Sequence, residues 1–298
     1  MKNQDITIVV VTYRSSKYVI ETLDAIYNQT YPSIHLIISD DCSPDDTLQV
    51  CQEWLDTHEK RFLSAKIIKT PKNLGSVGNC KQALVQVATE LYVMTAGDDY
   101  LAPTHVEKCV EKFQLMPDIA LAYTNAYLVL EKEGGRLIKE DITRFQEGGI
   151  FDELLQLKFW PKSTGWMLRK NAVESVGGYN TDVWVEDYDL ALRLAEKYPI
   201  GWVNEYLTYY RLHYTNVGGE SMKLIRAHIA TIQKYKNHPL FEDTMRIFKQ
   251  RMIQAAYYEQ PTYLLHQAIK QKEFSYIILY IKALWYKMKK LAKKLLKQ

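Results

Sequence analysis

Three groups of acidic residues are set apart in this chain by the patterns beside them. Asp40-Asp41 follows an apolar run typical of a strand, Asp98-Asp99 follows a second such run, and Glu186-Asp187-Tyr188-Asp189 opens a helical pattern. Gathering several carboxylates costs free energy unless a cation or a proton transfer requires them. A site that binds a nucleotide and a divalent metal ion, with a separate general base, would use all three groups.

The elements that must position these residues alternate along the first third of the chain. Strands are predicted at 6–11, 34–39, 66–69 and 91–95, and helices at 16–29, 48–55 and 75–88. This alternation indicates a parallel sheet with helices on both faces. Ligands bind beyond the carboxyl ends of the strands in such sheets. Both early Asp pairs follow strand ends, so we expect them in the site.

The pattern loosens after Pro103. A strand is predicted at 120–130, a charged segment at 131–149, a helix at 151–158 and a turn at Gly177-Gly178. A helix then runs from Glu186 toward Pro199, and an aromatic-rich strand covers 201–210. From Met222 the pattern is helical, with breaks near two prolines. We therefore predict a catalytic domain at 1–221 and a helical extension at 222–298.

Charge is distributed unevenly. Residues 1–221 carry 22 Lys and Arg against 31 Asp and Glu, a net charge of −9, whereas residues 222–298 carry 16 against 4, or +12. An acidic body with a basic tail argues against a nucleic-acid partner. The four cysteines form no C-x-x-C pair, and the start is polar without a signal peptide, so a cytoplasmic protein is expected.

Each candidate has a structural alternative. Tyr13 can stack on a nucleobase and Asp41 can accept a hydrogen bond from uracil, or they are a loop aromatic and a helix-capping aspartate. Asp98-Asp99 suits Mg²⁺ or Mn²⁺ on a diphosphate, or is a solvated turn. The cluster Arg211-Leu212-His213 can face a phosphate or form a surface turn.

The acids of the third group also have structural alternatives. Asp189 and Arg193 are four residues apart on one helix and can form a structural ion pair. Acids at a helix start favour the helix dipole, which accounts for one or two members of the group. A carboxylate aimed into a cleft can instead deprotonate an acceptor hydroxyl. Glycine-rich dinucleotide and P-loop motifs are absent from the sequence.

Read in order, these segments resemble the family 2 glycosyltransferases, which have the GT-A fold. The resemblance covers about residues 5–221 and rests on six segments whose combination is specific. They are Ile8–Arg14, Ile38–Thr47, Asn73-Leu74-Gly75 with Asn79, Thr95–Tyr100, Gly177-Gly178-Tyr179 with Glu186–Arg193, and Tyr210–His213 with Asn216 and Ser221. Ala96 stands where the family often has an additional Asp, and Arg14 where Asn is common.

The resemblance implies an inverting transfer of a sugar from a UDP-sugar or dTDP-sugar. Asp187 would be the base, and Asp99, Asp98 and His213 would hold Mn²⁺ or Mg²⁺. The nucleotide would be bound by Thr12, Tyr13, Arg14, Asp41, Asn73, Gly75, Asn79 and Asp98. The acceptor side and its surroundings would include Glu186, Trp166 and Arg211.

The C-terminal residues 275–298 indicate that the acceptor lies near a membrane. Apolar residues repeat at three and four through 277–295, and 282–297 contains seven lysines and no acid. This pattern is typical of an amphipathic helix on a membrane surface, and its alternative is a helix packed on the body. A saccharide or lipid-linked saccharide acceptor follows, in bacterial surface polysaccharide synthesis, with peripheral membrane contact through 275–298.

Three other classes fit less well. A sugar nucleotidyltransferase needs a Gly-rich loop after the first strand, and 12–17 contains no glycine. A non-catalytic nucleotide-sugar-binding module has no reason to keep both the metal pair and Asp187. A glycoside hydrolase needs a second carboxylate as nucleophile or as acid for the leaving group, and none is marked out.

Overall fold

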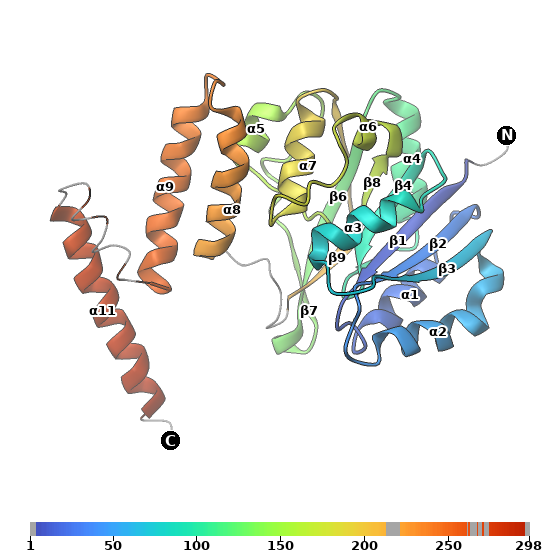
Figure 1. The fold of residues 1–298 in the computed structure, drawn as a ribbon, viewed down its shortest axis with the longest axis horizontal. Helices are drawn as coiled ribbons and strands as arrows, with labels where there is room; N and C mark the ends of the chain where they lie inside the picture. The colour runs from blue at the N-terminus through green and yellow to red at the C-terminus, as the bar shows by residue number, and fades with distance from the viewer. Residues whose placement is uncertain are drawn as a thin grey trace. The chain divides into compact units, whose positions relative to one another are not determined.

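The computed structural model describes residues 4–212, 221–260, 262, 267, 270 and 274–295. The chain divides into two compact units, Met1–Asn216 and Val217–Gln298. The first unit holds the sheet with its helices, and the described part of the second unit is helical (Figure 1).

The first unit alternates strands and helices. Its strands are β1 (Ile6–Thr12), β2 (Ile34–Asp40), β3 (Ser64–Lys69), β4 (Leu91–Ala96), β5 (Tyr100–Leu101), β6 (Leu121–Leu130), β7 (Arg136–Lys139), β8 (Trp166–Arg169) and β9 (Ile200–Leu212). Its α-helices are α1 (Val19–Tyr27), α2 (Thr47–His58), α3 (Gly75–Val85), α4 (His105–Leu115), α5 (Phe151–Leu155), α6 (Lys170–Ser175) and α7 (Glu186–Ala195). Single 3₁₀ turns are η1 (Glu59–Arg61) and η2 (Glu131–Glu133).

Within the described residues, nine strands form one sheet in the order β3-β2-β1-β4-β8-β6-β9-β5, with β7 paired to β6. The first four are parallel, as predicted from their alternation with helices. Beyond β4 the sheet becomes mixed: β8 is antiparallel to both β4 and β6, whereas β6 and β9 are parallel. This is the α/β fold expected of a GT-A domain.

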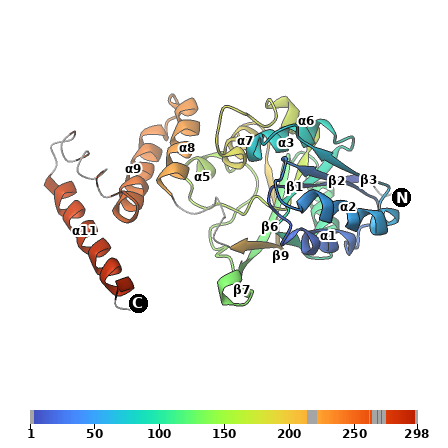
Figure 2. The ribbon, with the colours of Figure 1, turned by 60° about the horizontal axis from the view of Figure 1, so that its bottom comes forward.

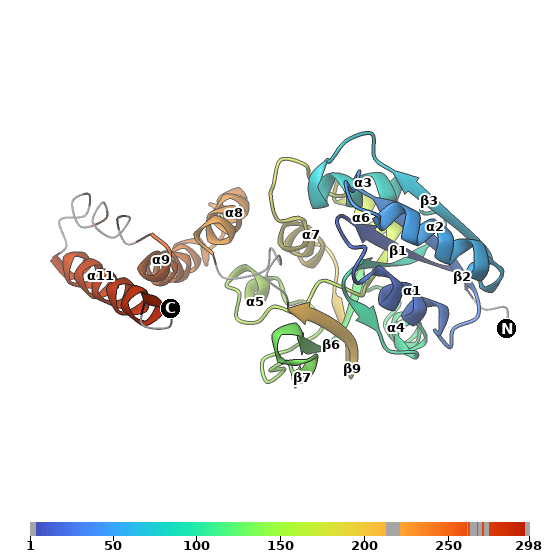
Figure 3. The same cartoon turned by 90° about the horizontal axis from the view of Figure 1, so that it is seen from below.

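Burial explains why β1 lies inside the sheet. Ile6, Ile8 and Val10 of β1 are fully buried and pack in one cluster with residues of α1, α2 and α4. Val9 is also buried and points to the opposite face, because side chains alternate along a strand. Figure 3 shows α1, α2 and α4 along one face of the sheet. The near-continuous apolar run of β1 is therefore that of a strand covered on both sides.

Several short elements fall in segments that the pattern left open. Residues 131–149, predicted only as a charged segment, contain β7, all four of whose residues are exposed. Pairing with β6 holds β7 in place, in the hairpin visible in green in Figure 2. Short exposed strands carry no apolar periodicity, so local sequence does not reveal them.

The second unit contains α8 (Met222–Ile232), the 3₁₀ turn η3 (Gln233–Tyr235), α9 (Phe241–Tyr258) and α11 (Phe274–Leu295). Ser221 caps α8 by accepting a hydrogen bond from the Leu224 N–H at 3.1 Å. The predicted break near Pro239 lies between η3 and α9, whereas Pro261 lies outside the described residues. In the part of the chain that is described, every helix is too short or too polar to cross a bilayer.

Helix α11 is apolar on two sides. Tyr276 and Ala283 are buried, whereas a row of exposed apolar side chains follows a spacing of three and four along a different side: Ile278, Ile281, Trp285 and Met288. The Lys289 ammonium lies 3.7 Å from the centre of the Trp285 ring.

Candidate active site

Parallel pairing brings the ends of β1, β2 and β4 to one edge of the sheet. Thr12 pairs with Asp40, and Val11 pairs with Ala96. The chain after β4 then passes close to the start of the loop after β1, and Gly97 makes this possible. A Cβ at Gly97 would lie 2.7 Å from Cγ2 of Thr12, too close for any other residue without a shift of the chain.

Asp40 and Asp41 have different structural tasks. The buried Asp40 carboxylate accepts hydrogen bonds from the Thr12 hydroxyl at 3.0 Å, the Ser43 hydroxyl at 2.6 Å and the Ser43 N–H at 2.9 Å. Asp40 therefore ties together the loops that follow β1 and β2. Thr12, predicted at the nucleotide, takes part in this anchor.

The buried Asp41 carboxylate closes the loop before α3. It accepts from the Thr70 hydroxyl at 2.9 Å and from the backbone N–H groups of Leu74 and Gly75, both at 2.8 Å. The Asn73 side chain accepts from the same Gly75 N–H at 3.0 Å. Gly75 has φ +76°, which glycine adopts without strain. Asp41, Asn73 and Gly75 thus form one structural unit at the sheet edge.

Two other predicted nucleotide residues differ in accessibility. Asn79 is buried on α3, where its side chain hydrogen-bonds both the hydroxyl and the carbonyl of Ser39. Tyr13 is 43% exposed. Arg14 has φ +55°, an uncommon backbone conformation for a side-chain-bearing residue, and its guanidinium lies 5.4 Å from the centre of the Tyr13 ring. Tyr13 therefore offers an aromatic surface at the site, whereas Asn79 supports the fold beneath it.

The Asp98-Asp99 turn is locked to strand β9. Asp99 is 2% exposed, and its carboxylate accepts from the Arg211 backbone N–H at 2.8 Å. The Asp99 carbonyl accepts from the Thr22 hydroxyl at 2.7 Å. Burial, followed by the Asp98 charge, raises the pKa of Asp99 well above its usual value. Asp98 is the more accessible of the two.

Arg211 lies under this turn. Its Nε donates to the Asp98 carbonyl at 2.9 Å, and its guanidinium forms an ion pair with Glu21. The guanidinium also lies 4.9 Å from the ring centre of Tyr18 and 5.6 Å from that of Tyr100. Arg211 is buried among these groups, so the structure places it as support for the Asp98-Asp99 turn. His213 lies outside the described residues.

The third acidic group begins α7, as the sequence predicted. Asp189 is buried and forms the expected ion pair with Arg193. Glu186 accepts from the Ser76 hydroxyl at 2.6 Å, and burial, followed by the Asp187 charge, raises the pKa of Glu186 to about 7. Burial also raises the pKa of Asp187, while hydrogen bonds from Ser163 and the Tyr188 N–H oppose that rise.

A loop that sequence reasoning did not single out connects these groups. The Thr164 hydroxyl lies 2.9 Å from that of Thr95 and accepts from the Ala96 N–H at 3.4 Å, both on β4, and Thr164 lowers the pKa of Asp99. The preceding residue, Ser163, lowers the pKa of Asp187. Two adjacent residues thus bring the Asp98-Asp99 turn and the start of α7 together. The signal in the sequence was the small polar run Ser163-Thr164-Gly165 directly before β8.

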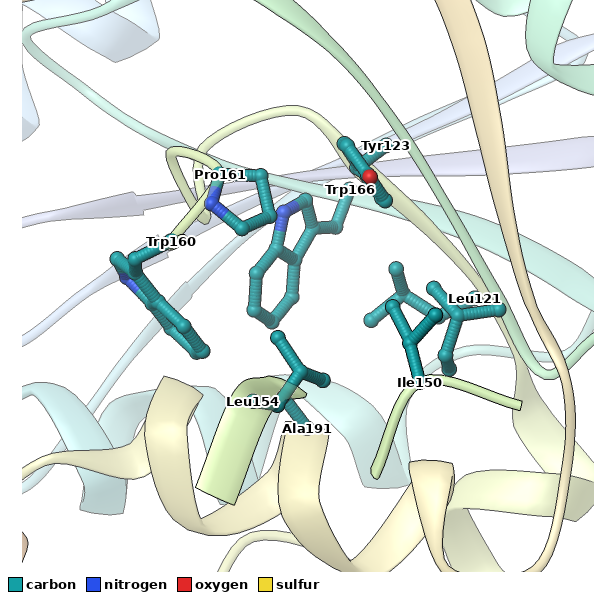
Figure 4. A pocket seen from close by; sticks show the side chains of 9 residues that line it. Leu121, Tyr123, Ile150, Leu154, Trp160, Pro161, Trp166 and Ala191 are labelled. Atoms are coloured by element: carbon teal, nitrogen blue, oxygen red, sulfur yellow. The ribbon is translucent and has the colours of Figure 1, made fainter. Parts of the chain in front are cut away.

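Trp166, predicted on the acceptor side or in its surroundings, is a buried residue next to this loop. Figure 4 shows its indole lining a small apolar cavity. The lining residues are Leu121, Tyr123, Ile150, Leu154, Trp160, Pro161, Trp166, Ala191 and Ile200. Its Nε1 has no hydrogen-bond partner among the described residues. Trp166 therefore belongs to the apolar core beside the Ser163-Thr164 loop.

The Asp98-Asp99 pair has the donor set for a hard divalent cation. Carboxylate oxygens are what Mg²⁺ and Mn²⁺ prefer, and a cation beside a buried carboxylate of raised pKa would stabilise its charge. Within the described residues the pair is not joined by a third His, Cys, Asp or Glu as a complete metal-binding group.

Comparison with known proteins agrees with this geometry. The sequence model of glycosyl transferase family 2 matches residues 7–177, more than half of the chain. The chain belongs to glycosyl transferase family 2. Its matched region extends from the first strand past β8 and includes the Asp pairs and the Ser163-Thr164 loop.

The relatives of this family 2 chain include a chondroitin synthase and an O-antigen biosynthesis glycosyltransferase. Chondroitin synthase of Escherichia coli is 27% identical over 250 residues, which cover 79% of this chain and 34% of that protein. The chain therefore spans about a third of that relative. The O-antigen biosynthesis glycosyltransferase WbnJ of Escherichia coli is 27% identical over 217 residues, or 70% of this chain and 80% of that protein.

Solved structures share the fold at low identity. TarS residues 1–349 of Staphylococcus aureus, in complex with UDP-GlcNAc, matches with a TM-score of 0.61 and 16% identity, covering 94% of this chain and 79% of that one. The mannosyltransferase PcManGT of Pyrobaculum calidifontis, in complex with GDP-Man and Mn²⁺, matches with a TM-score of 0.62 and 16% identity, covering 96% and 85%. These matches establish the GT-A fold of the family 2 chain.

Proposed function

We propose that this family 2 glycosyltransferase moves a sugar, with inversion, from a UDP-sugar or dTDP-sugar to a hydroxyl of a saccharide or lipid-linked saccharide. The observation that carries the proposal is that the segment before β8 reaches both acidic groups: the Thr164 hydroxyl bonds to the end of β4, and Thr164 and Ser163 lower the pKa of Asp99 and of Asp187, respectively. Adjacent residues thereby hold the diphosphate side and the base side of one site. A binding module would need only the first.

The nucleotide would lie along the edge formed by the ends of β1 and β2. The exposed ring of Tyr13 suits stacking on a base, and the loop closed by Asp41 lies on the same edge. Asp41 already accepts three hydrogen bonds, so a uracil N–H would take a remaining acceptor position on its carboxylate. The UDP and UDP-GlcNAc complexes of TarS support a uridine nucleotide here.

Asp98 and Asp99 would hold Mn²⁺ or Mg²⁺. Such an ion, when bound, neutralises charge on a leaving diphosphate. The Mn²⁺ and GDP-Man in the PcManGT complex support this assignment. Arg211 and Thr164 keep the turn in place while the charge at the diphosphate changes.

Asp187 would act as general base. The acceptor hydroxyl oxygen forms a bond to the anomeric carbon, the bond from that carbon to the diphosphate oxygen breaks, and Asp187 takes the hydroxyl proton. The raised pKa of Asp187 suits this task, because a stronger base removes the proton more readily. Ser163 favours the ionised carboxylate, which is the form that accepts the proton.

The acceptor would lie near an anionic membrane surface, in surface polysaccharide synthesis. The exposed row on α11 that includes Ile281 and Trp285 supports peripheral contact, with Lys282 and Lys289 nearby to meet lipid headgroups. O-antigen biosynthesis by the relative WbnJ supports a surface glycan as the product.

The test is calorimetric titration with UDP, UDP-GlcNAc, dTDP and GDP, with Mn²⁺ or with EDTA, followed by transfer assays. UDP binding should depend on metal, vanish in Asp98→Asn and persist in Asp187→Asn. Asp187→Asn should lower the transfer rate about 10²–10⁴-fold. Asp182→Asn, an exposed neighbour, is the matched control. Absence of nucleotide binding under every condition would refute the proposal.

A further inference from the structure

Helices α3 and α7 are joined at their first turns by a hydrogen bond between residues 110 positions apart. The Ser76 hydroxyl, in the first turn of α3, donates at 2.6 Å to Oε1 of Glu186, the first residue of α7. The two helices lie next to each other in Figures 1 and 2. Asp187, the proposed base, directly follows Glu186. One hydrogen bond therefore connects the start of α3 to the residue before the base.

Ser76 follows the loop that Asp41 closes. The Gly75 N–H donates to the Asp41 carboxylate at 2.8 Å, so the backbone just before Ser76 is fixed to the residue that follows β2. Asn79, about one turn further along α3, is buried and donates to the Ser39 carbonyl of β2 at 2.9 Å. Ser76 thus lies between two attachments of α3 to the end of β2. Its hydroxyl is held in place from the proposed nucleotide edge of the sheet.

The two ends of α7 are held differently. Tyr188 is fully buried, and its hydroxyl donates to the Leu155 carbonyl at 3.0 Å, which anchors the helix beyond Asp187. The residue before the helix, Val185, provides no side-chain cap. Because the first N–H groups of a helix lack intrahelical partners, the geometry of that turn depends on side-chain contacts. The hydrogen bond from Ser76 holds this turn by its first side chain.

The segment before α7 also packs on α3. A Cβ placed on Gly178 would lie 3.8 Å from Cδ2 of Leu84, a buried residue near the end of α3. Helix α3 therefore contacts the chain around α7 near both of its ends. Packing at Gly178 keeps the two regions together, and the Ser76 hydrogen bond sets their alignment at the end nearest Asp187.

We propose that Glu186 is a positioning residue that couples the nucleotide loop to the base through Ser76. This inference rests on the proposed nucleotide edge and on the proposed role of Asp187. A nucleotide bound at this edge restrains the loop that Asp41 closes, and the restraint reaches the first turn of α7 through the Ser76–Glu186 hydrogen bond. Restraining one segment lowers the cost of ordering a segment bonded to it. The base is therefore held most firmly when the donor is bound.

Hydrogen–deuterium exchange read by mass spectrometry tests the coupling without turnover. The Leu190 N–H reports the first turn of α7, because an α-helical N–H bonds to the carbonyl four residues earlier, here that of Glu186. Without nucleotide, Ser76→Ala should speed exchange around Leu190 about 3–10-fold. UDP with Mn²⁺ should slow this exchange in the wild type and in Ser76→Thr, which keeps the hydroxyl, but not in Ser76→Ala. Ser175→Ala removes a hydroxyl that lies 2.9 Å from that of Tyr198, and this control should behave as the wild type.

Steady-state transfer tests the effect on the base. Ser76→Ala should lower kcat about 10-fold and leave the KM of the donor within about twofold, because the nucleotide contacts stay while the base is misaligned. Glu186→Gln keeps an acceptor oxygen, whereas Glu186→Ala removes it. Adding Ser76→Ala should therefore lower kcat further in Glu186→Gln and leave kcat of Glu186→Ala nearly unchanged.

Several results would overturn the inference. They are an exchange rate around Leu190 that Ser76→Ala does not change, protection by UDP that persists in Ser76→Ala, and effects of Ser76→Ala and Glu186→Ala on kcat that add in full. A wild type that binds UDP but transfers no sugar would refute the proposed function, and the exchange rates would still decide the coupling. Absence of UDP binding would refute both.

Discussion

The carboxylate of Asp99 accepts a hydrogen bond at 2.8 Å from the backbone N–H of Arg211, a residue 112 positions later in the chain. Strand β9 therefore holds the turn that follows β4. The Arg211 side chain extends the same contact to the Asp98 carbonyl and to Glu21. Arg211 therefore supports the Asp98-Asp99 turn through both its backbone and its side chain.

Replacing Arg211 by Met should destabilise the first unit by about 1–3 kcal/mol, because the Asp98 carbonyl and Glu21 lose a charged partner. Urea unfolding measures the change, and UDP titration should show weaker binding. Arg136→Met is the control, since that side chain is exposed and pairs with Glu133 on the surface. Equal unfolding midpoints for the two variants would contradict the assigned support role.

Replacing Gly75 by Ala should cost about 1 kcal/mol of stability and weaken UDP binding. A Cβ at Gly75 would meet nothing within 4 Å, so the cost comes from its backbone at φ +76°. Gly149→Ala adds a Cβ in similarly open space without a left-handed φ and serves as control. Urea unfolding and UDP titration of both variants test this prediction. If Gly75→Ala left stability and UDP affinity unchanged, the loop would not shape the nucleotide site.

The pH dependence of transfer should have an acid limb near neutrality. The rate falls as pH decreases because the acids at the start of α7 take up protons, and the pKa of Glu186 is about 7. Glu186→Gln removes a negative charge beside Asp187, so the limb should move to lower pH. The measurement is kcat/KM against pH, with Glu196→Gln at the exposed end of α7 as control. A limb that does not move would exclude coupling between the two acids.

Stability should fall as pH decreases from about 6.5 to about 4 because of buried His105. Burial lowers the pKa of His105 from 6.5 to about 4, so the unfolded chain binds this proton first as pH decreases. The contribution of His105 to the free energy of unfolding is complete above pH 6.5. About 3 kcal/mol of it is lost by pH 4. His105→Gln should flatten this slope in urea unfolding, whereas His35→Gln, on a partly exposed residue of β2, should not. Parallel slopes in all three proteins would contradict the prediction.

The exposed row on α11 should bind anionic vesicles. Ile281→Gln combined with Trp285→Gln should reduce flotation with vesicles of phosphatidylcholine and phosphatidylglycerol, because apolar area is lost from the bound face. Trp285 is 56% exposed. Leu115→Gln, also at an exposed apolar residue, is the control. Binding that is equal on pure phosphatidylcholine or insensitive to salt would argue against an electrostatic contribution of the lysines.

The strands, helices and acidic residues that local patterns encode could be predicted from the sequence. The strands at Ile6 and Ile34 and the start of α7 at Glu186 followed from β-branched runs and helical spacing. The Asp pairs were found because strand ends are visible in the sequence. The mixed half of the sheet was not apparent, since the pairing of β8 with β4 and β6 depends on contacts between distant segments.

In the candidate site, too, the sequence indicated which residues matter but not which contacts they make. Residue types marked Asp41 as important, but only the structure shows that its carboxylate closes the loop at Leu74 and Gly75. Trp166 was predicted on the acceptor side or in its surroundings, and only the structure shows that its side chain is buried. Side-chain direction and long-range hydrogen bonds are not encoded in spacing, so these assignments needed coordinates. The boundary between the two proposed domains, at 221, remains a proposal beside the structural division at Asn216.

The adjacency of Ser163 and Thr164 limits how this protein can change in length. One inserted residue between them would move the residue that acts on Asp187 and the residue that acts on Asp99 further apart, by up to about 3.5 Å. Insertions earlier, in the exposed segment around β7, leave that spacing intact. Changes in length are therefore expected to accumulate in the hairpin of β6 and β7, while the segment just before β8 stays at a fixed length.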